Sequence, residues 1–239
     1  MGTFRRLFAV AALAGLIAGV LVTVVHQIAT VPVILDAEVF EQSAGAEPGS
    51  EAAAPAGTAA AGHDHEHEAQ PWGPRDGFER TAYTALADIL TGIGFALLLV
   101  TAYVVKGDSL DWRKGLRWGL AGFAALTLAP GLGLPPEVPG TESAPLLARQ
   151  TWWIATAVST SAGLALIFFG RQPLPSLLGV ALIVLPHAYG APASATAASA
   201  APEALEHRFV VAVTVTSLLF WLSLGTLTGF FYERIFKED

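Results

Sequence analysis

The chain has 239 residues, of which only 14% are charged, and a mean hydropathy of +0.54. Soluble domains carry about 25% charged residues, so this composition is typical of a protein that lies in a bilayer. The net charge of −7 argues against a nucleic-acid partner, which requires a basic surface. The absence of cysteine excludes disulfides, thiolate zinc sites and cysteine nucleophiles.

The first apolar run covers residues 7–29 and follows Arg5 and Arg6. It is too long for the apolar region of a signal peptide, and no A-x-A cleavage site follows it. We therefore predict a membrane helix that stays in the protein. We expect it to end near Thr30, because Pro32 disfavours helical geometry at the residue before it.

Residues 31–80 form a long polar stretch between the first two apolar runs, rich in Ala, Gly, Pro and Glu. Such a composition buries too little apolar surface to offset the entropy lost on ordering. The stretch is therefore predicted to be a loop, mobile over most of 43–75.

The remaining apolar runs predict further membrane helices, because a helix needs roughly 20 apolar residues to cross the hydrocarbon. With the first run, they give an all-α polytopic membrane protein of about six transmembrane helices in a single transmembrane domain, residues 1–239. Prolines interrupt two of the runs, and we expect breaks at Pro130 and Pro186. The predicted later helices cover about 81–105, 116–134, 150–170, 174–190 and 208–232.

Six crossings place both termini on one side of the membrane, and the positive-inside rule selects which side. With the N-terminus inside, nine of the 13 basic residues fall in inner segments, so both termini are predicted to be cytoplasmic. The loop 31–80 then faces the outer compartment. The four basic residues of the outer segments are Arg75, Arg80, Arg149 and Arg208.

Within the loop, residues 61–70 read AGHDHEHEAQ, so half of the six histidines alternate with acids. Imidazole suits nickel, cobalt, copper and zinc, and carboxylate suits harder ions. In an extended chain the histidines project from one side, and in a helical turn the first and last share a face. The alternative is a solvated linker without function. The predicted metal-capturing residues are His63, Asp64, His65, Glu66 and His67.

Three ionisable residues lie near the outer ends of predicted helices: His26, Asp88 and His187. Ionisable groups inside a bilayer are expensive and mark pathways or sites, so all three are candidate metal contacts. Three structural alternatives, without a role in metal binding, remain open. His26 could bond to a neighbouring helix, His187 could bond a free carbonyl at a broken helix, and Asp88 could pair with Arg80.

Small residues recur inside three predicted helices, as TGIG at 91–94, GLAG at 119–122 and SAG at 161–163. Small side chains let helix backbones approach one another in a membrane. These motifs predict close helix packing.

The residues favour uptake of a divalent transition-metal ion through the membrane, but these ligand types alone do not select cobalt over nickel. The competing function is a membrane protein that binds metal without transporting it, such as a sensor or an assembly subunit. Neither H-E-x-x-H nor G-x-x-x-x-G-K-[ST] is present, so we expect no enzyme, no organic cofactor and no nucleotide-driven step. The sequence leaves the number of copies open, with a homo-oligomer as one alternative.

Seven segments in this order resemble the CbtA family of predicted bacterial cobalt transporter subunits. The resemblance implies a multi-pass inner-membrane protein that supplies cobalt for cobalamin synthesis and works with a small membrane partner subunit, CbtB. It also implies His26, the histidines of the loop and His187 as candidate metal contacts. The segments are FRRLFAVAALAGLIAGVLVTVVHQ, VPVILDAEVFE, GHDHEHE, W-x-P-x-DGFERTAYT, LAPGLGLPPEVPG, RQTWW and LPHAYGAP.

Overall fold

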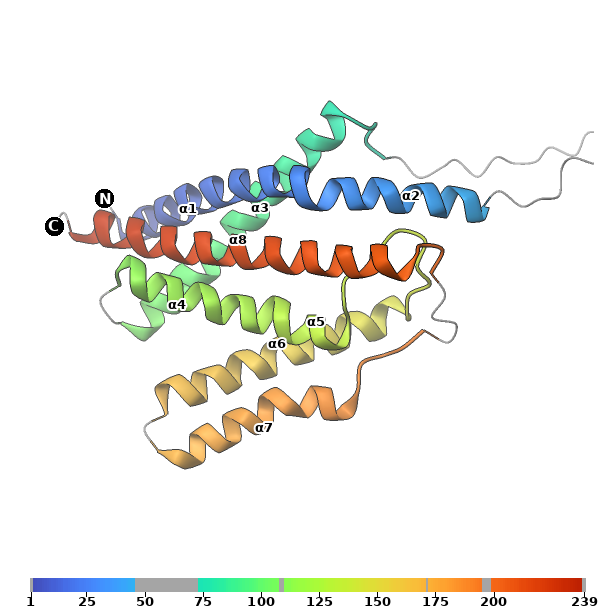
Figure 1. The fold of residues 1–239 in the computed structure, drawn as a ribbon. Coiled ribbons are helices and arrows are strands. Elements are labelled where there is room, and N and C mark those ends of the chain that lie inside the picture. The colour runs from blue at the N-terminus through green and yellow to red at the C-terminus, as the bar shows by residue number, and fades with distance from the viewer. Residues whose placement is uncertain (1, 46–72, 108–109, 171, 195–198, 238–239) are drawn as a thin grey trace, which may run out of the picture.

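The computed structural model describes residues 2–45, 73–107, 110–170, 172–194 and 199–237 (Figure 1). This part of the chain is built from helices, and one isolated bridge between Thr141 and Ser199 links two of the connections. The elements are α1 Thr3–Val25, η1 His26–Thr30, α2 Val31–Gly45, α3 Phe78–Lys106, α4 Trp112–Phe123, η2 Ala124–Leu128, α5 Ala129–Gly133, α6 Leu146–Phe169, α7 Pro173–Tyr189 and α8 Glu203–Lys237.

The elements form six rods that alternate in direction: α1–η1–α2, α3, α4–η2–α5, α6, α7 and α8 (Figure 1). Both termini lie at one end of the molecule, together with the α3–α4 and α6–α7 connections. The end of α2 and the connections that precede α6 and α8 lie at the opposite end. This alternation is what six sequential crossings require.

Four of the described helices are long and apolar enough to cross a membrane. Helix α7, with 17 residues, is apolar but shorter. The α4–η2–α5 rod carries Arg113, Lys114 and Arg117 in its first part. The chain is therefore an all-α polytopic membrane protein, as predicted. The four candidate spans are Thr3–Ser43, Phe78–Lys106, Leu146–Phe169 and Glu203–Phe236.

The predicted end of the first helix near Thr30 is wrong. The helix continues through the π-helical turn η1 into α2, and Val31 keeps helical angles (φ −57°, ψ −46°). Its N–H bonds to the carbonyl of His26, five residues back. The wider turn accommodates the ring of Pro32, which would otherwise clash with the carbonyl four residues earlier. The polar stretch predicted to begin at residue 31 is consequently helical as far as Gly45.

The expected break at Pro130 is also wrong, for the same structural reason. A second π-helical turn, η2, precedes it, and the N–H of Ala129 bonds to the carbonyl of Ala124. Helix α7 also continues through Pro186, for about one turn, and ends at Tyr189. There Gly190 adopts a left-handed φ of +96°, which stops the helix. None of the three prolines therefore ends its helix.

Helices pack closely where glycines face one another, as the small-residue motifs predicted. A Cβ added at Gly92 would lie 2.6 Å from the Gly15 carbonyl oxygen, so α1 and α3 touch through their backbones. Gly163 and Gly179 do the same for α6 and α7, and a Cβ on either would lie 2.5 Å from the other's carbonyl oxygen. Gly119 of α4 packs against α8 in the same way. Such contacts supply the dispersion energy that holds helices together in lipid.

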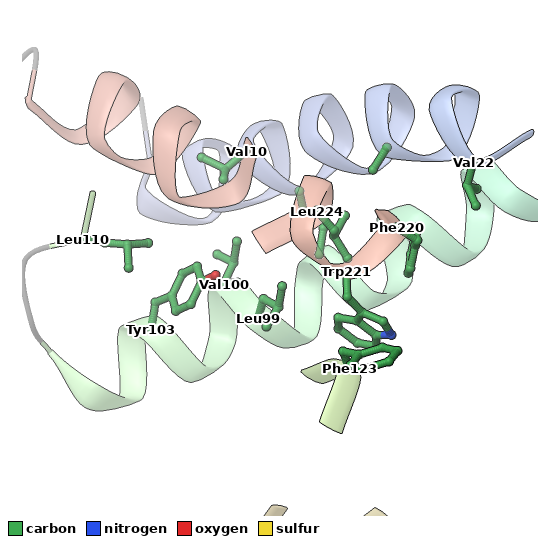
Figure 2. Packing of buried hydrophobic residues seen from close by; sticks show 13 residues of the cluster. Val10, Val22, Leu99, Val100, Tyr103, Leu110, Phe123, Phe220, Trp221 and Leu224 are labelled. Atoms are coloured by element: carbon green, nitrogen blue, oxygen red, sulfur yellow. The ribbon is translucent and has the colours of Figure 1, made fainter. Parts of the chain in front are cut away.

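The main apolar core lies between α1, α3, α4 and α8 (Figure 2). Trp221 of α8 belongs to the same cluster as Phe123 of α4 and donates through Nε1 to the Thr127 hydroxyl, 3.2 Å away. Helix α8 packs on α1 and α4, whereas the main neighbour of α7 is α6. The α6–α7 pair therefore lies at the side of the bundle. The labelled core residues are Val10, Val22, Leu99, Val100, Tyr103, Leu110, Phe123, Phe220, Trp221 and Leu224.

Candidate metal site

The candidate site begins with a close approach of α1 and α3. A Cβ added at Gly19 would lie 2.5 Å from the Cα of Ile89, so only glycine lets the two backbones come this near. Thr23 lies one turn after Gly19 and His26 nearly two turns after it, on the same face of the helix. This face meets Asp88 of α3, which neighbours Ile89.

The structure brings together His26 and Asp88, two residues that the sequence nominated separately. The His26 Nδ1 lies 3.1 Å from the Asp88 Oδ2, and the Thr23 hydroxyl donates to the same oxygen at 2.9 Å. The side chain of Asp88 is 15% exposed and that of His26 29%. An imidazole nitrogen and a carboxylate oxygen therefore meet between two helices, and both atoms are ligands for first-row transition metals.

The alternative pairing of Asp88 with Arg80 does not occur. The Arg80 guanidinium instead binds Glu38 of α2 at 2.6 Å and Asp76, just before α3, at 2.9 Å. Glu38 is therefore an ion-pair partner rather than a solvated acid. These contacts tie α2 to α3 and leave the Asp88 carboxylate to His26 and Thr23.

His187 lies apart from this pair. It belongs to the last turn of α7, and its ring packs edge-on against Trp152 of α6, with 5.7 Å between the ring centres. The indole Nε1 of Trp152 donates to the carbonyl of Pro186 at 3.3 Å. Because α7 packs mainly on α6, the side chain of His187 belongs to the α6–α7 pair and not to the α1–α3 contact.

The remaining candidate ligands, His63, Asp64, His65, Glu66 and His67, lie outside the described residues. Among the residues that the structure does describe, no group of three or more His, Asp or Glu side chains could hold a metal ion. The pair of His26 and Asp88 therefore offers two side chains of the types that ligate metals, which is fewer than such a group of three.

Sequence reasoning missed Thr23 and Gly19. Thr23 precedes His26 by three residues, a helical spacing that places the hydroxyl beside the imidazole. That spacing was a usable signal inside an otherwise apolar run. The importance of Gly19 could not be predicted from the sequence, because it depends on α3 being the neighbouring helix.

A family model described as "Probable cobalt transporter subunit (CbtA)" matches residues 4–233, nearly the whole chain. The chain belongs to the CbtA family. Membership in this family indicates cobalt as the transported ion and makes the chain a subunit, which implies partner subunits. It also implies a role in transport rather than catalysis. No curated protein and no solved structure matches the chain.

The CbtA match spans both helices that form the His26–Asp88 pair and the 46–72 segment between them. It also spans α7, which carries His187. The resemblance noted from seven short segments is confirmed by this match over nearly the entire length.

Proposed function

We propose that this CbtA protein carries Co²⁺ inward across the bacterial inner membrane and that His26 and Asp88 hold the ion during passage. The single observation that carries the proposal is the 3.1 Å approach of the His26 imidazole to the Asp88 carboxylate between two membrane-spanning helices. A partly buried acid is costly in a bilayer and marks a pathway or site. The cargo follows from the family.

Capture is assigned to the histidine-rich stretch 63–67, on the periplasmic side. Two features support this orientation. Most basic residues belong to the end of the bundle that holds both termini, which the positive-inside rule places in the cytoplasm. Helix α2, which precedes the 46–72 segment in sequence, ends at the opposite end of the bundle. Imidazoles and carboxylates there would bind Co²⁺ reversibly and pass it toward His26.

At the paired site, His26 supplies a nitrogen ligand and Asp88 an oxygen ligand with one negative charge. Without metal, the two side chains and Thr23 satisfy one another through hydrogen bonds, which lowers the cost of burying the carboxylate. An incoming ion would take the place of the hydrogen bond between His26 and Asp88. Nickel prefers the same ligand types, so these two residues alone do not select cobalt over nickel.

The driving force comes from the membrane or from a partner, since no nucleotide-binding motif is present. An inside-negative potential of 100 mV supplies about 2.3 kcal/mol per charge, or about twice that for a divalent cation. We propose a small membrane partner resembling CbtB as the second subunit, with the number of copies of each chain set by the assembly.

A second candidate function is an accessory protein that binds cobalt at the membrane and delivers it to another permease. It is favoured by the separation of His187 from His26 and by the lack of a three-ligand group among the described residues. The two functions differ in one measurable property, which is flux of cobalt through this chain.

The proposal is tested by cobalt accumulation in bacteria that lack their own cobalt uptake and express this chain with its small partner subunit. Replacing His63, His65 and His67 together by Ala is expected to lower uptake most at low external cobalt, because capture is then limiting. His187→Ala tests whether α7 lies on the path, and His207→Ala, at an exposed position of α8, is the matched control. Mass spectrometry of washed cells measures the metal.

Accumulation that depends on the chain and falls in the loop variant supports uptake with outer capture. Accumulation that is equal with and without the chain contradicts the proposal. A loop variant that takes up cobalt like the wild type at every concentration removes the capture step.

A further inference from the structure

A polar section interrupts the apolar contact between α8 and the long first rod. Val22 and Phe220 belong to the main core, whereas Val33 and Phe209 belong to a second core near the outer end. Helix α8 runs antiparallel to α1–η1–α2 (Figure 1), so the π-helical turn η1 faces the part of α8 around Thr216. This section is bounded by apolar side chains on both sides.

Two hydroxyls in this section are buried without a hydrogen-bond partner. Thr30 of η1 is 6% exposed and Thr216 of α8 is 1% exposed. Thr216 shares its helix face with Phe209 and Phe220, since the spacings of seven and four residues each complete whole turns. It therefore points toward the first rod, as Phe209 does, which packs with Val33 and Ala37. Buried hydroxyls are almost always hydrogen-bonded, so these two remain available to a ligand.

The backbone of η1 adds oxygen atoms to the same place. The N–H of Val31 reaches back to the carbonyl of His26, and Pro32 has no N–H to offer the next carbonyl. The turn therefore leaves a carbonyl at Gln27 or Ile28 without its helical donor. Freed carbonyls at interrupted membrane helices are the groups that coordinate coupling cations in transporters.

The Asp88 carboxylate supplies the charge at this level of the bundle. Its hydrogen bonds with Thr23 and His26 both use the Oδ2 oxygen. One carboxylate is enough to balance the whole charge of a monovalent ion in a low-dielectric setting. Hydroxyl, carbonyl and carboxylate oxygens are hard ligands that suit such an ion better than they suit a transition metal.

We propose that the section between η1 and Thr216 binds Na⁺ as a coupling ion, with oxygen ligands from Thr30, Thr216, the freed carbonyl of η1 and Asp88. The inference rests on the proposed transport function, for which it names the ion whose gradient drives uptake. Because both sites use Asp88, binding of one ion changes the electrostatic potential at the site of the other, and this couples the two ions.

The test measures thermal unfolding of the purified full-length protein in detergent, without cobalt, in NaCl, KCl or choline chloride at one ionic strength. A ligand that binds only the folded state raises the midpoint in a saturable way. We expect that rise with Na⁺ and not with choline. Thr216→Val should weaken the apparent affinity for Na⁺ by about tenfold or more, because a charged hydrogen-bond or ion contact is lost.

The chain offers a matched control in Thr160 of α6. Its hydroxyl is also buried without a partner, at 3% exposed, but it lies on a different helix, away from η1. Thr160→Val should keep the Na⁺ response, and Thr216→Ser should restore it because the hydroxyl returns. If Thr216→Val fails to fold, binding of ²²Na⁺ to the Asp88→Asn protein serves as the second measurement, with loss of binding expected.

An equal midpoint in NaCl and choline chloride overturns the proposal, and so does a full Na⁺ response in Thr216→Val or full ²²Na⁺ binding in Asp88→Asn. Cobalt uptake into vesicles with and without Na⁺ separates this inference from the transport function. Uptake that is indifferent to Na⁺ contradicts the coupling site and leaves transport intact. Na⁺ binding without any cobalt uptake contradicts transport and leaves the Na⁺ site.

Discussion

A single hydrogen-bonded pair, His26 with Asp88, is the centre of this account at the residue scale. Both side chains could be nominated from the sequence, because ionisable groups within apolar runs are rare and costly. Their pairing could not be predicted, because it depends on α1 and α3 being neighbours with His26 and Asp88 at the same height. Arg80 shows the same limit, because its choice of Glu38 over Asp88 depends on α2 being a helix.

The pair makes a prediction about metal binding. In a chain whose loop histidines are all replaced by Ala, so that capture by the loop is absent, His26→Ala should weaken Co²⁺ binding by about tenfold or more, because one of few ligands is gone. His207→Ala, exposed on α8, is the control and should bind like its parent. Isothermal titration calorimetry in detergent measures the affinity. Equal affinity in the His26 and His207 variants would place the membrane site elsewhere.

At the scale of elements, the apolar runs predicted the helices well, but the helix ends predicted from prolines were wrong. Pro32 and Pro130 each stand two residues after a π-helical turn, which widens the helix and removes the clash that a proline creates in a regular turn. The residue pattern around either proline carries no distinct mark of such a turn. Helix α2 was not predicted either, because it is stabilised by tertiary packing: Val33 and Ala37 are buried against α8 and the 134–145 connection.

Glycines at helix contacts make a prediction about stability that one helix can test by itself. Gly92→Ala in α3 should destabilise the protein, because the new methyl group would meet the Gly15 carbonyl oxygen at 2.6 Å. Gly94→Ala, two residues later, meets open space and should be neutral or stabilising by up to about 1 kcal/mol through helix propensity.

Thermal unfolding of the purified variants gives the comparison. A lower midpoint for both variants, or for neither, would show that the α1–α3 contact is looser than the structure has it.

At the scale of the whole molecule, six rods alternate in direction, and α8 runs antiparallel to the rod that carries His26. The alternation and the all-α class followed from the number and length of the apolar runs. The arrangement of rods did not, because α8 packs on α4 through glycines far apart in sequence. Membrane orientation rests on the basic residues gathered at one end, and it can be tested directly.

The chain contains no cysteine, so single cysteines report topology without background. Ser43→Cys at the exposed end of α2 should react in intact cells with a maleimide that cannot cross membranes. Thr3→Cys, exposed at the start of α1, should react only after the cells are opened. The opposite pattern would mean that the histidine-rich segment faces the cytoplasm, and capture from outside would be wrong.

The central claim is that cobalt passes through this bundle by way of Asp88, and initial rates of Co²⁺ entry into proteoliposomes test it most directly. The vesicles hold the purified chain, with and without the small partner subunit, under an inside-negative potential. We predict saturable entry for the wild type and for the control Asp36→Asn, which changes an exposed acid of α2. Asp88→Asn should reduce the rate by about tenfold or more, because it removes the negative charge that stabilises a cation inside the membrane. Entry at background level in every preparation, while the wild-type protein still binds cobalt, would contradict transport and leave an accessory metal-binding protein.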